Sequence, residues 1–131
     1  MAVVPLLSDD EAGAEALATF NDIRAKRQTD YVNNFWRALA HDPPQLKAVW
    51  EQIQTVMAPG ALDPLVKELI YVAVSVANGC GYCIHSHTAA ARAKGMTPAM
   101  QAELLAVIAM ASQTNALATA LQVPVDERFT L

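Results

Sequence analysis

Three helix starts are marked in the chain by a polar capping residue followed directly by proline. These pairs are Asp42-Pro43, Asp63-Pro64 and Thr97-Pro98. Proline suits the first position of a helix, because its fixed φ is helical and its missing N–H would have no partner there. No stretch combines a sustained period-two alternation of apolar and polar residues with the turn signals of a sheet. The sequence therefore predicts an all-α fold.

We expect about six helices, which begin near Ser8, Tyr31, Pro43, Pro64, Cys80 and Pro98. The first has Ser8 as its cap with Glu11 three residues later, and ends near Gln28. The residues expected to face the core from the first two helices are Ala14, Leu17, Ala18, Ile23, Tyr31, Phe35, Trp36 and Leu39. The sixth helix should reach Pro124, and the polar residues 112–114 are a candidate kink.

Length and composition predict a single domain over residues 1–131. No apolar run approaches the roughly 20 residues of a membrane span. The first five residues lack the basic start and apolar core of a signal peptide, so we expect a cytoplasmic protein. A net charge of −4 with scattered basic residues argues against binding to nucleic acid.

The fourth and sixth helices are apolar over most of their circumference, as in residues 69–76 and 104–111. A helix that is apolar all round must be covered on every side, and one layer of neighbours can hardly cover two such helices. Hydrophobic residues make up 53% of the chain. The remaining apolar surface would exceed what soluble monomers tolerate, so we expect a homo-oligomer.

Both cysteines lie in one short stretch, Cys80-Gly81-Tyr82-Cys83, with His85 and His87 close behind. The apolar residues before it predict a buried helix that ends at Gly79, and the residues after it predict a second helix that ends at Gly95. The cysteines therefore open a helix, where partial positive charge and unpaired N–H groups favour the thiolate.

On a helix, Cys80, Cys83 and His87 share one face. Residues three apart have Cβ atoms about 5–6 Å from each other. A disulfide needs roughly 3.5–4.5 Å, so only a small local adjustment is required. His87 lies one turn beyond Cys83, close enough to take its proton, whereas His85 points elsewhere.

Two other interpretations of this stretch need weighing. The cysteines could be small buried apolar residues, although a glycine between them and a histidine one turn on make this less frequent. Structural zinc is disfavoured, because one short helix cannot wrap Cys80, Cys83, His85 and His87 around a tetrahedral ion. We expect no metal and no cofactor.

Glu68 is the one acidic residue in a narrow polar stripe on the fourth helix, together with Tyr71 and Ser75. Two interpretations stay open from the pattern. Glu68 is either a solvated carboxylate on an outward face, or a carboxylate aimed back at the cysteine helix, since the joint at Gly79 folds the two helices together.

Glu68, then Cys80 twelve residues on, then Cys83 and His87, resembles the core of the AhpD-like alkylhydroperoxidase group. This group belongs to the carboxymuconolactone decarboxylase superfamily. The resemblance covers roughly residues 30 to 115. It implies an all-helical fold that assembles into oligomers, as trimers or hexamers.

The chemistry that the resemblance implies is a thiol-dependent peroxidase. Cys83 would attack the peroxide oxygen and become a sulfenic acid, and Cys80 would resolve it to a disulfide. Glu68 and His87 would form the proton relay that generates the thiolate. The partners would be a hydroperoxide and a thiol or lipoyl-type reductant.

Tyr82 stands where the AhpD proteins carry a further histidine, and a neutral phenol cannot replace an imidazole in a relay at pH 7. Two alternatives to the peroxidase stay open. One is an oligomer whose cysteines report oxidation without turnover. The other is a decarboxylase or isomerase of small lactones, although the decarboxylase branch of the superfamily needs no redox cysteine pair.

Overall fold

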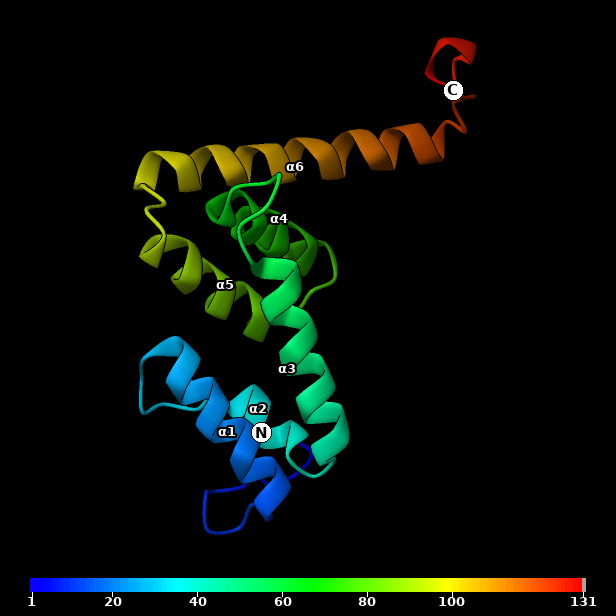
Figure 1. The fold of residues 1–131 in the computed structure, drawn as a ribbon. Helices are drawn as coiled ribbons and strands as arrows, with labels where there is room; N and C mark the ends of the chain where they lie inside the picture. The colour runs from blue at the N-terminus through cyan, green and yellow to red at the C-terminus, as the bar shows by residue number, and fades with distance from the viewer. Residues whose placement is uncertain (131) are drawn as a thin grey trace. The chain divides into compact units, whose positions relative to one another are not determined.

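The computed structural model describes residues 1–130, and in this part of the chain every regular element is a helix (Figure 1). The elements are α1 (Ala14–Arg27), α2 (Asn34–Leu39), α3 (Pro43–Met57), α4 (Pro64–Ala77), α5 (Gly81–Ala93), α6 (Pro98–Ala120) and the short 3-10 helix η1 (Glu127–Phe129). The prediction of an all-α fold with about six helices is confirmed.

Contacts between residues divide the chain into two compact units, Met1–Ala58 and Pro59–Leu131. The first unit holds α1 to α3, and the second holds α4 to α6. All the candidate site residues belong to the second unit. A single domain over residues 1–131 stays a prediction.

The three pairs of cap and proline each begin a helix, as predicted. Each capping side chain accepts a backbone N–H of the first turn: Asp42 from Gln45 (3.1 Å), Asp63 from Leu65 (2.9 Å) and Thr97 from Met100 (3.2 Å). These donors have no partner within their own helices, so the caps satisfy them. Local sequence is therefore enough to place the starts of α3, α4 and α6.

The first helix begins at Ala14, and the prediction that Ser8 caps it was wrong. Ser8 Oγ does accept the Glu11 N–H at 3.3 Å, and the Glu11 carboxylate accepts the Ser8 N–H at 2.9 Å. These bonds close only a single turn. Gly13 then adopts an extended backbone, with φ −65° and ψ 164°, and separates this turn from α1.

Of the residues predicted to face the core from the first two helices, Ile23 and Trp36 are buried and Leu17 and Leu39 pack against the core, whereas the others do not fit the prediction. The buried residues of α1 are Ala16, Thr19, Phe20 and Ile23, whereas Ala14 and Ala18 are exposed. Trp36 is buried in α2, but Tyr31 and Phe35 are 62% and 43% exposed. α2 has only six residues and begins after Tyr31, so less than two turns present side chains to the core.

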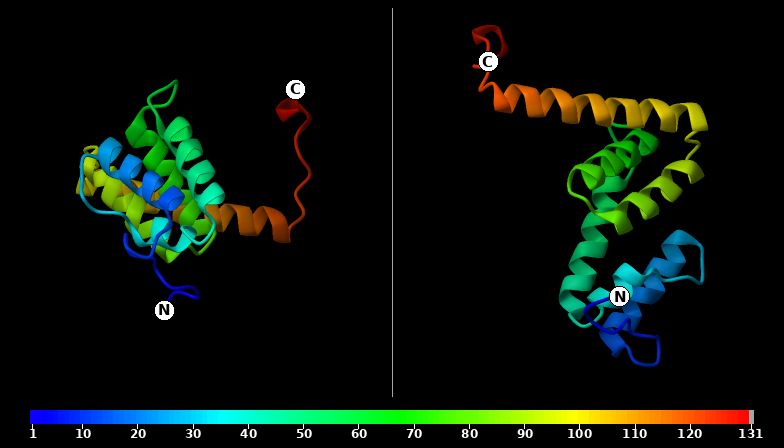
Figure 2. Two further views of the ribbon diagram at one scale, coloured as in Figure 1. Left: turned by 60° about the horizontal axis from the view of Figure 1, so that its bottom comes forward. Right: turned by 180° about the vertical axis from the view of Figure 1, so that it is seen from behind.

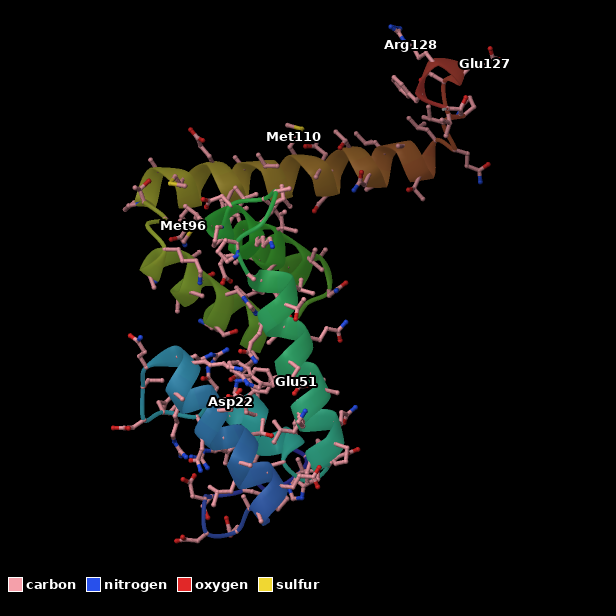
Figure 3. The ribbon with its side chains drawn as sticks, viewed as in Figure 1. Asp22, Glu51, Met96, Met110, Glu127 and Arg128 are labelled. Atoms are coloured by element: carbon pink, nitrogen blue, oxygen red, sulfur yellow. A yellow bond between two sulfur atoms is a disulfide. The ribbon has the colours of Figure 1, made fainter. Side chains whose placement is uncertain are left out.

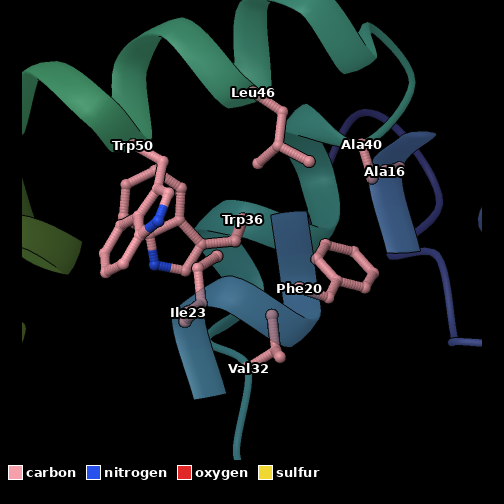
Figure 4. Packing of buried hydrophobic residues seen from close by; sticks show 8 residues of the cluster. All are labelled: Ala16, Phe20, Ile23, Val32, Trp36, Ala40, Leu46 and Trp50. Carbon is pink, nitrogen blue, oxygen red and sulfur yellow. The ribbon is translucent and has the colours of Figure 1, made fainter. Parts of the chain in front are cut away.

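The core of the first unit is built around two tryptophans that meet edge to face (Figure 4). The ring centroids of Trp36 and Trp50 lie 5.4 Å apart, with the planes at 79°. Trp50 Nε1–H donates to the Asp22 carboxylate at 2.7 Å, and this bond lowers the pKa of Asp22. The other members of this core are Ala16, Phe20, Ile23, Val32, Ala40 and Leu46.

In the second unit, α4 and α5 lie side by side and are joined at Gly79 (Figures 1 and 2). The Gly79 N–H donates to the Val76 carbonyl at 3.1 Å, and the Cys80 N–H donates to the Ser75 carbonyl at 2.9 Å. This pair of bonds is a Schellman motif, which ends a helix with a left-handed residue, here Gly79 at φ 68°. The predicted joint is confirmed.

α6 is a continuous helix of 23 residues that packs on α4 near its own beginning. It shows no break at the candidate kink, residues 112–114, and it ends at Ala120, short of Pro124. Its later half extends beyond α4 and α5 (Figures 1 and 2), and Met110 points away from α4 (Figure 3). Within residues 1–130, no helix is both long and apolar enough to span a membrane.

We predict that the stability of the second unit depends on Gly79 but not on Gly81. An alanine at position 79 has open space for its Cβ, yet it must adopt the left-handed backbone, at a cost of about 1–2 kcal/mol. Gly81 also has open space and no positive φ, so Gly81→Ala should leave stability unchanged or raise it by up to about 1 kcal/mol. Denaturant titration of both variants measures this. Equal stabilities would contradict a strained joint.

Candidate functional site

Cys80 and Cys83 are joined by a disulfide at the beginning of α5. Their Cα atoms lie 5.4 Å apart. Cys80 is the N-cap residue, and its Sγ accepts the backbone N–H of Cys83 at 3.3 Å. The sequence placed both cysteines at a helix start and allowed them to pair, and the structure contains both features.

Glu68 lies on the face of α4 that meets α5, and it is only 4% exposed. Its Oε2 lies 2.7 Å from His87 Nδ1, and its Oε1 accepts a hydrogen bond from Lys94 Nζ at 2.9 Å. His87 lies on α5, and Lys94 is the C-cap residue of that helix. Of the two interpretations of Glu68, the structure therefore contains the carboxylate aimed at the cysteine helix, and the solvated one was wrong.

The Glu68 carboxyl is held in its ionised form by its two partners. Burial alone raises its pKa, because a low dielectric disfavours charge. The hydrogen bonds from His87 and Lys94, together with the Lys94 charge, outweigh burial and hold the pKa of Glu68 below its ordinary value. The cluster is therefore a buried carboxylate with a donor on each oxygen.

Tyr71 lies one turn after Glu68 on α4 and stacks on the His87 imidazole. The two ring centroids are 3.5 Å apart, with 17° between the planes. The imidazole thus has a carboxylate at one edge and a phenol ring against one face. Only 16% of the His87 side chain is exposed. These contacts limit both the rotation of the ring and its access to water.

Sequence analysis missed Lys94. It placed Tyr71 in the polar stripe of the fourth helix but did not predict its contact with His87. A signal for Lys94 was available, since it follows His87 by seven residues, two turns along the same face of α5. The spacing cannot say that the side chain reaches back to Glu68. A lysine in the last turn of a helix usually interacts with solvent and the helix dipole.

The remaining histidines lie away from this cluster. His85 is exposed, in agreement with its expected direction. His41 Nε2 lies 2.8 Å from the Pro5 carbonyl oxygen, in the first unit. Tyr82, between the cysteines, is 45% exposed. In residues 1–130, no group of three or more His, Cys, Asp and Glu side chains is arranged to hold a metal ion.

A model of the carboxymuconolactone decarboxylase family matches residues 44–126. The chain belongs to this family. The match includes the α4–α5 pair and all four predicted site residues. The resemblance identified from Glu68, Cys80, Cys83 and His87 is therefore confirmed at the level of the family.

Two proteins similar to this chain carry the name AhpD. The chain is 41% identical over 71 residues to the alkyl hydroperoxide reductase AhpD of Solibacter usitatus (strain Ellin6076), a match that covers 54% of this chain and 38% of that protein. It is 63% identical to the alkylhydroperoxidase AhpD core of Rhodospirillum rubrum ATCC 11170. The TM-score with that crystal structure is 0.96, over 100% of this chain and 98% of the other.

We predict that Glu68 stabilises the folded protein near neutral pH and loses this effect in acid. In the unfolded chain a glutamate has a pKa near 4.3, and the folded pKa is lower, so protonation favours unfolding. The stability difference between the natural protein and Glu68→Gln should shrink as the pH falls from about 5 to about 3. Other carboxyl groups cancel in this difference, which denaturant titrations measure. A constant difference would contradict a carboxylate stabilised by its ionic partners.

Proposed function

We propose that the protein is a thiol-dependent peroxidase that reduces hydroperoxides by cycling Cys80 and Cys83 between dithiol and disulfide. The observation that carries the proposal is a disulfide at the start of α5, on the same helix as an imidazole held by a buried carboxylate. The two similar proteins are named for alkylhydroperoxide chemistry, which supports the same activity here.

In the proposed cycle, the Cys83 thiolate attacks one oxygen of the hydroperoxide. An S–O bond forms, the O–O bond breaks, and the leaving alkoxide takes a proton and departs as an alcohol. Cys83 is now a sulfenic acid. Cys80 attacks this sulfur, the S–S bond forms, and hydroxide leaves as water. A dithiol reductant of the thiol or lipoyl type then supplies two electrons and two protons to restore both thiols.

Glu68 and His87 would move the proton from Cys83. An ionised carboxylate can only accept hydrogen bonds, so we infer that His87 Nδ1 carries a hydrogen and donates it to Glu68. This tautomer leaves the lone pair of Nε2 available as a base. His87 lies one helical turn after Cys83, and the stacked Tyr71 ring holds the imidazole in place.

Cys80 suits the role of the resolving thiol that leaves again when the disulfide is reduced. Its Sγ accepts the Cys83 N–H at the N-terminus of α5. A hydrogen bond and the positive end of the helix both favour a thiolate, and a stabilised thiolate leaves more readily. We therefore propose that the reductant attacks Cys83 Sγ and releases Cys80.

We predict different outcomes for the two cysteine variants. Cys83→Ser should abolish peroxide turnover, because the attacking thiol is gone. Without added reductant, Cys80→Ser should consume about one equivalent of peroxide per chain and stop at the sulfenic acid. Steady-state peroxide consumption with dihydrolipoamide or dithiothreitol measures turnover, and a sulfenate-specific probe with mass spectrometry identifies the oxidised residue. Labelling of Cys80 in Cys83→Ser, with none of Cys83 in Cys80→Ser, would reverse the assignment.

The peroxide assay and the two cysteine variants together separate the other two functions. A redox-sensing oligomer would consume one equivalent of peroxide and show no turnover with any dithiol. A decarboxylase or isomerase would act on small lactones equally well in both cysteine-to-serine variants.

We also propose that the protein is a homo-oligomer, a trimer or hexamer, in which α6 and the segment after it are covered by other copies. Between Glu103 and Asp126 the sequence has no charged residue. Large apolar side chains are nevertheless exposed there, namely Leu105, Val107, Met110, Leu117, Leu121, Val123 and Val125. A further exposed stripe on α4 consists of Val66, Ile70 and Val74. Exposed apolar side chains gathered in this way are typical of a surface that another protein covers.

Light scattering at micromolar concentration should give a mass that is a multiple of 14.1 kDa. Leu117→Glu should lower this mass, because it places a charge in the proposed contact. Ala25→Glu puts the same charge on an exposed position of α1 and serves as the control. A clean monomer for the natural protein would contradict the proposal.

A further inference from the structure

The Glu68 carboxylate has two partners, and the proposed relay uses only one of them. Lys94 occupies the second oxygen, Oε1, at 2.9 Å. Only 6% of the Glu68 side chain is exposed, so water can do little to replace this bond. Lys94 is itself fixed at the C-cap of α5. The Gly95 N–H donates to the Arg92 carbonyl at 3.0 Å, and the Met96 N–H donates to the Ala91 carbonyl at 2.9 Å.

A carboxylate with one partner can turn about its Cγ–Cδ bond and offer either oxygen to that partner. With a donor on each oxygen its plane is fixed, because a rotation would lengthen both bonds. The direction of the Glu68–His87 bond then fixes the imidazole ring within its stack on Tyr71. The orientation of His87 Nε2 follows from that of the ring.

We propose that Lys94 is a positioning residue for the thiol-oxidation centre, which holds Glu68 Oε1 so that Oε2 keeps His87 in the orientation of a base. This inference rests on the proposed peroxidase function. Lys94 does not touch the reacting atoms, and it acts through Glu68 and His87. Its role therefore differs from that of an ion pair that only joins α4 to α5.

Lys94 also sets the charge of the cluster. It balances the Glu68 carboxylate, and removal of a cation makes the remaining groups take up a proton at a higher pH. The α5 groups that contact Glu68 are His87 and Lys94. On α6, the other helix packed on α4, the one charged residue is the exposed Glu103. Lys67 precedes Glu68 on α4 itself. Loss of the Lys94 ammonium should therefore move the acidic limb of the activity profile upward.

The test uses the reduced full-length protein and two substitutions. Lys94→Met keeps most of the apolar stem and removes the charge, whereas Lys94→Arg keeps a cation. The rate of oxidation by hydrogen peroxide is measured from about pH 5 to 9, and kcat and KM are measured with dihydrolipoamide as reductant. Lys94→Met should lower the oxidation rate and kcat about 10- to 100-fold, leave the KM for peroxide unchanged, and shift the acidic limb to higher pH. Lys94→Arg should keep most of the natural oxidation rate, and the acidic limb of its pH–rate profile should lie close to that of the natural protein.

Lys47→Met is the matched control, because it breaks the exposed Lys47–Glu51 ion pair in the first unit. It should leave the pH profile unchanged. Lys94 is partly exposed, so its variants should fold, and circular dichroism checks this. A folded Lys94→Met with the natural rate and pH profile would overturn the inference and leave the peroxidase proposal standing. A natural protein without peroxide turnover would instead remove the peroxidase proposal.

Discussion

The arrangement of the second unit depends on one buried carboxylate. Glu68 meets two donors from α5, and both bonds require α4 and α5 to be antiparallel and in one register. Glu68 lies 11 residues before Gly79 and the fully buried Ala91 lies 12 residues after it, so the two come to the same level. His87 and Lys94 lie one turn on either side of Ala91. The small alanine lets the helices approach, and the two longer side chains enclose the carboxylate.

Where sequence alone predicted the fold correctly, the signal was local. The caps at Asp42, Asp63 and Thr97 depend on the next three residues, and the joint at Gly79 depends on a backbone that glycine adopts freely. The start of α1 was predicted wrongly because the Ser8–Glu11 bonds imitate a helix cap but close only one turn. On its buried face Ile23 and Leu17 were predicted correctly, whereas the alanines were not, because alanine suits either face of a helix. Only packing against Trp36 and Trp50 selects the face that carries Phe20.

In the candidate site, too, sequence predicted the features that depend on local signals and missed those that depend on packing between helices. The position of the cysteines follows from local helix signals, whereas the direction of Glu68 depends on the register between two helices. The spacing places Lys94 on the same face as His87, but its contact with Glu68 could not be predicted, because it depends on the conformation of a long flexible side chain. It leaves the helix end, where a cation already suits the dipole, and still reaches a carboxylate on α4. The Tyr71 stack similarly requires the distance between the helices, which no spacing encodes.

One face of α5 carries Cys80, Cys83, His87, Ala91 and Lys94, with steps of three and four residues. The part of this face from His87 to Lys94 also packs on α4. In the proposed cycle, the groups that hold the proton are therefore the groups that hold the helices together. The thiols lie at the positive end of α5, beside the chain reversal, where a disulfide can open without displacing the carboxylate cluster. In the proposed cycle, this separation along one helix would let the disulfide open and close while His87 keeps its orientation.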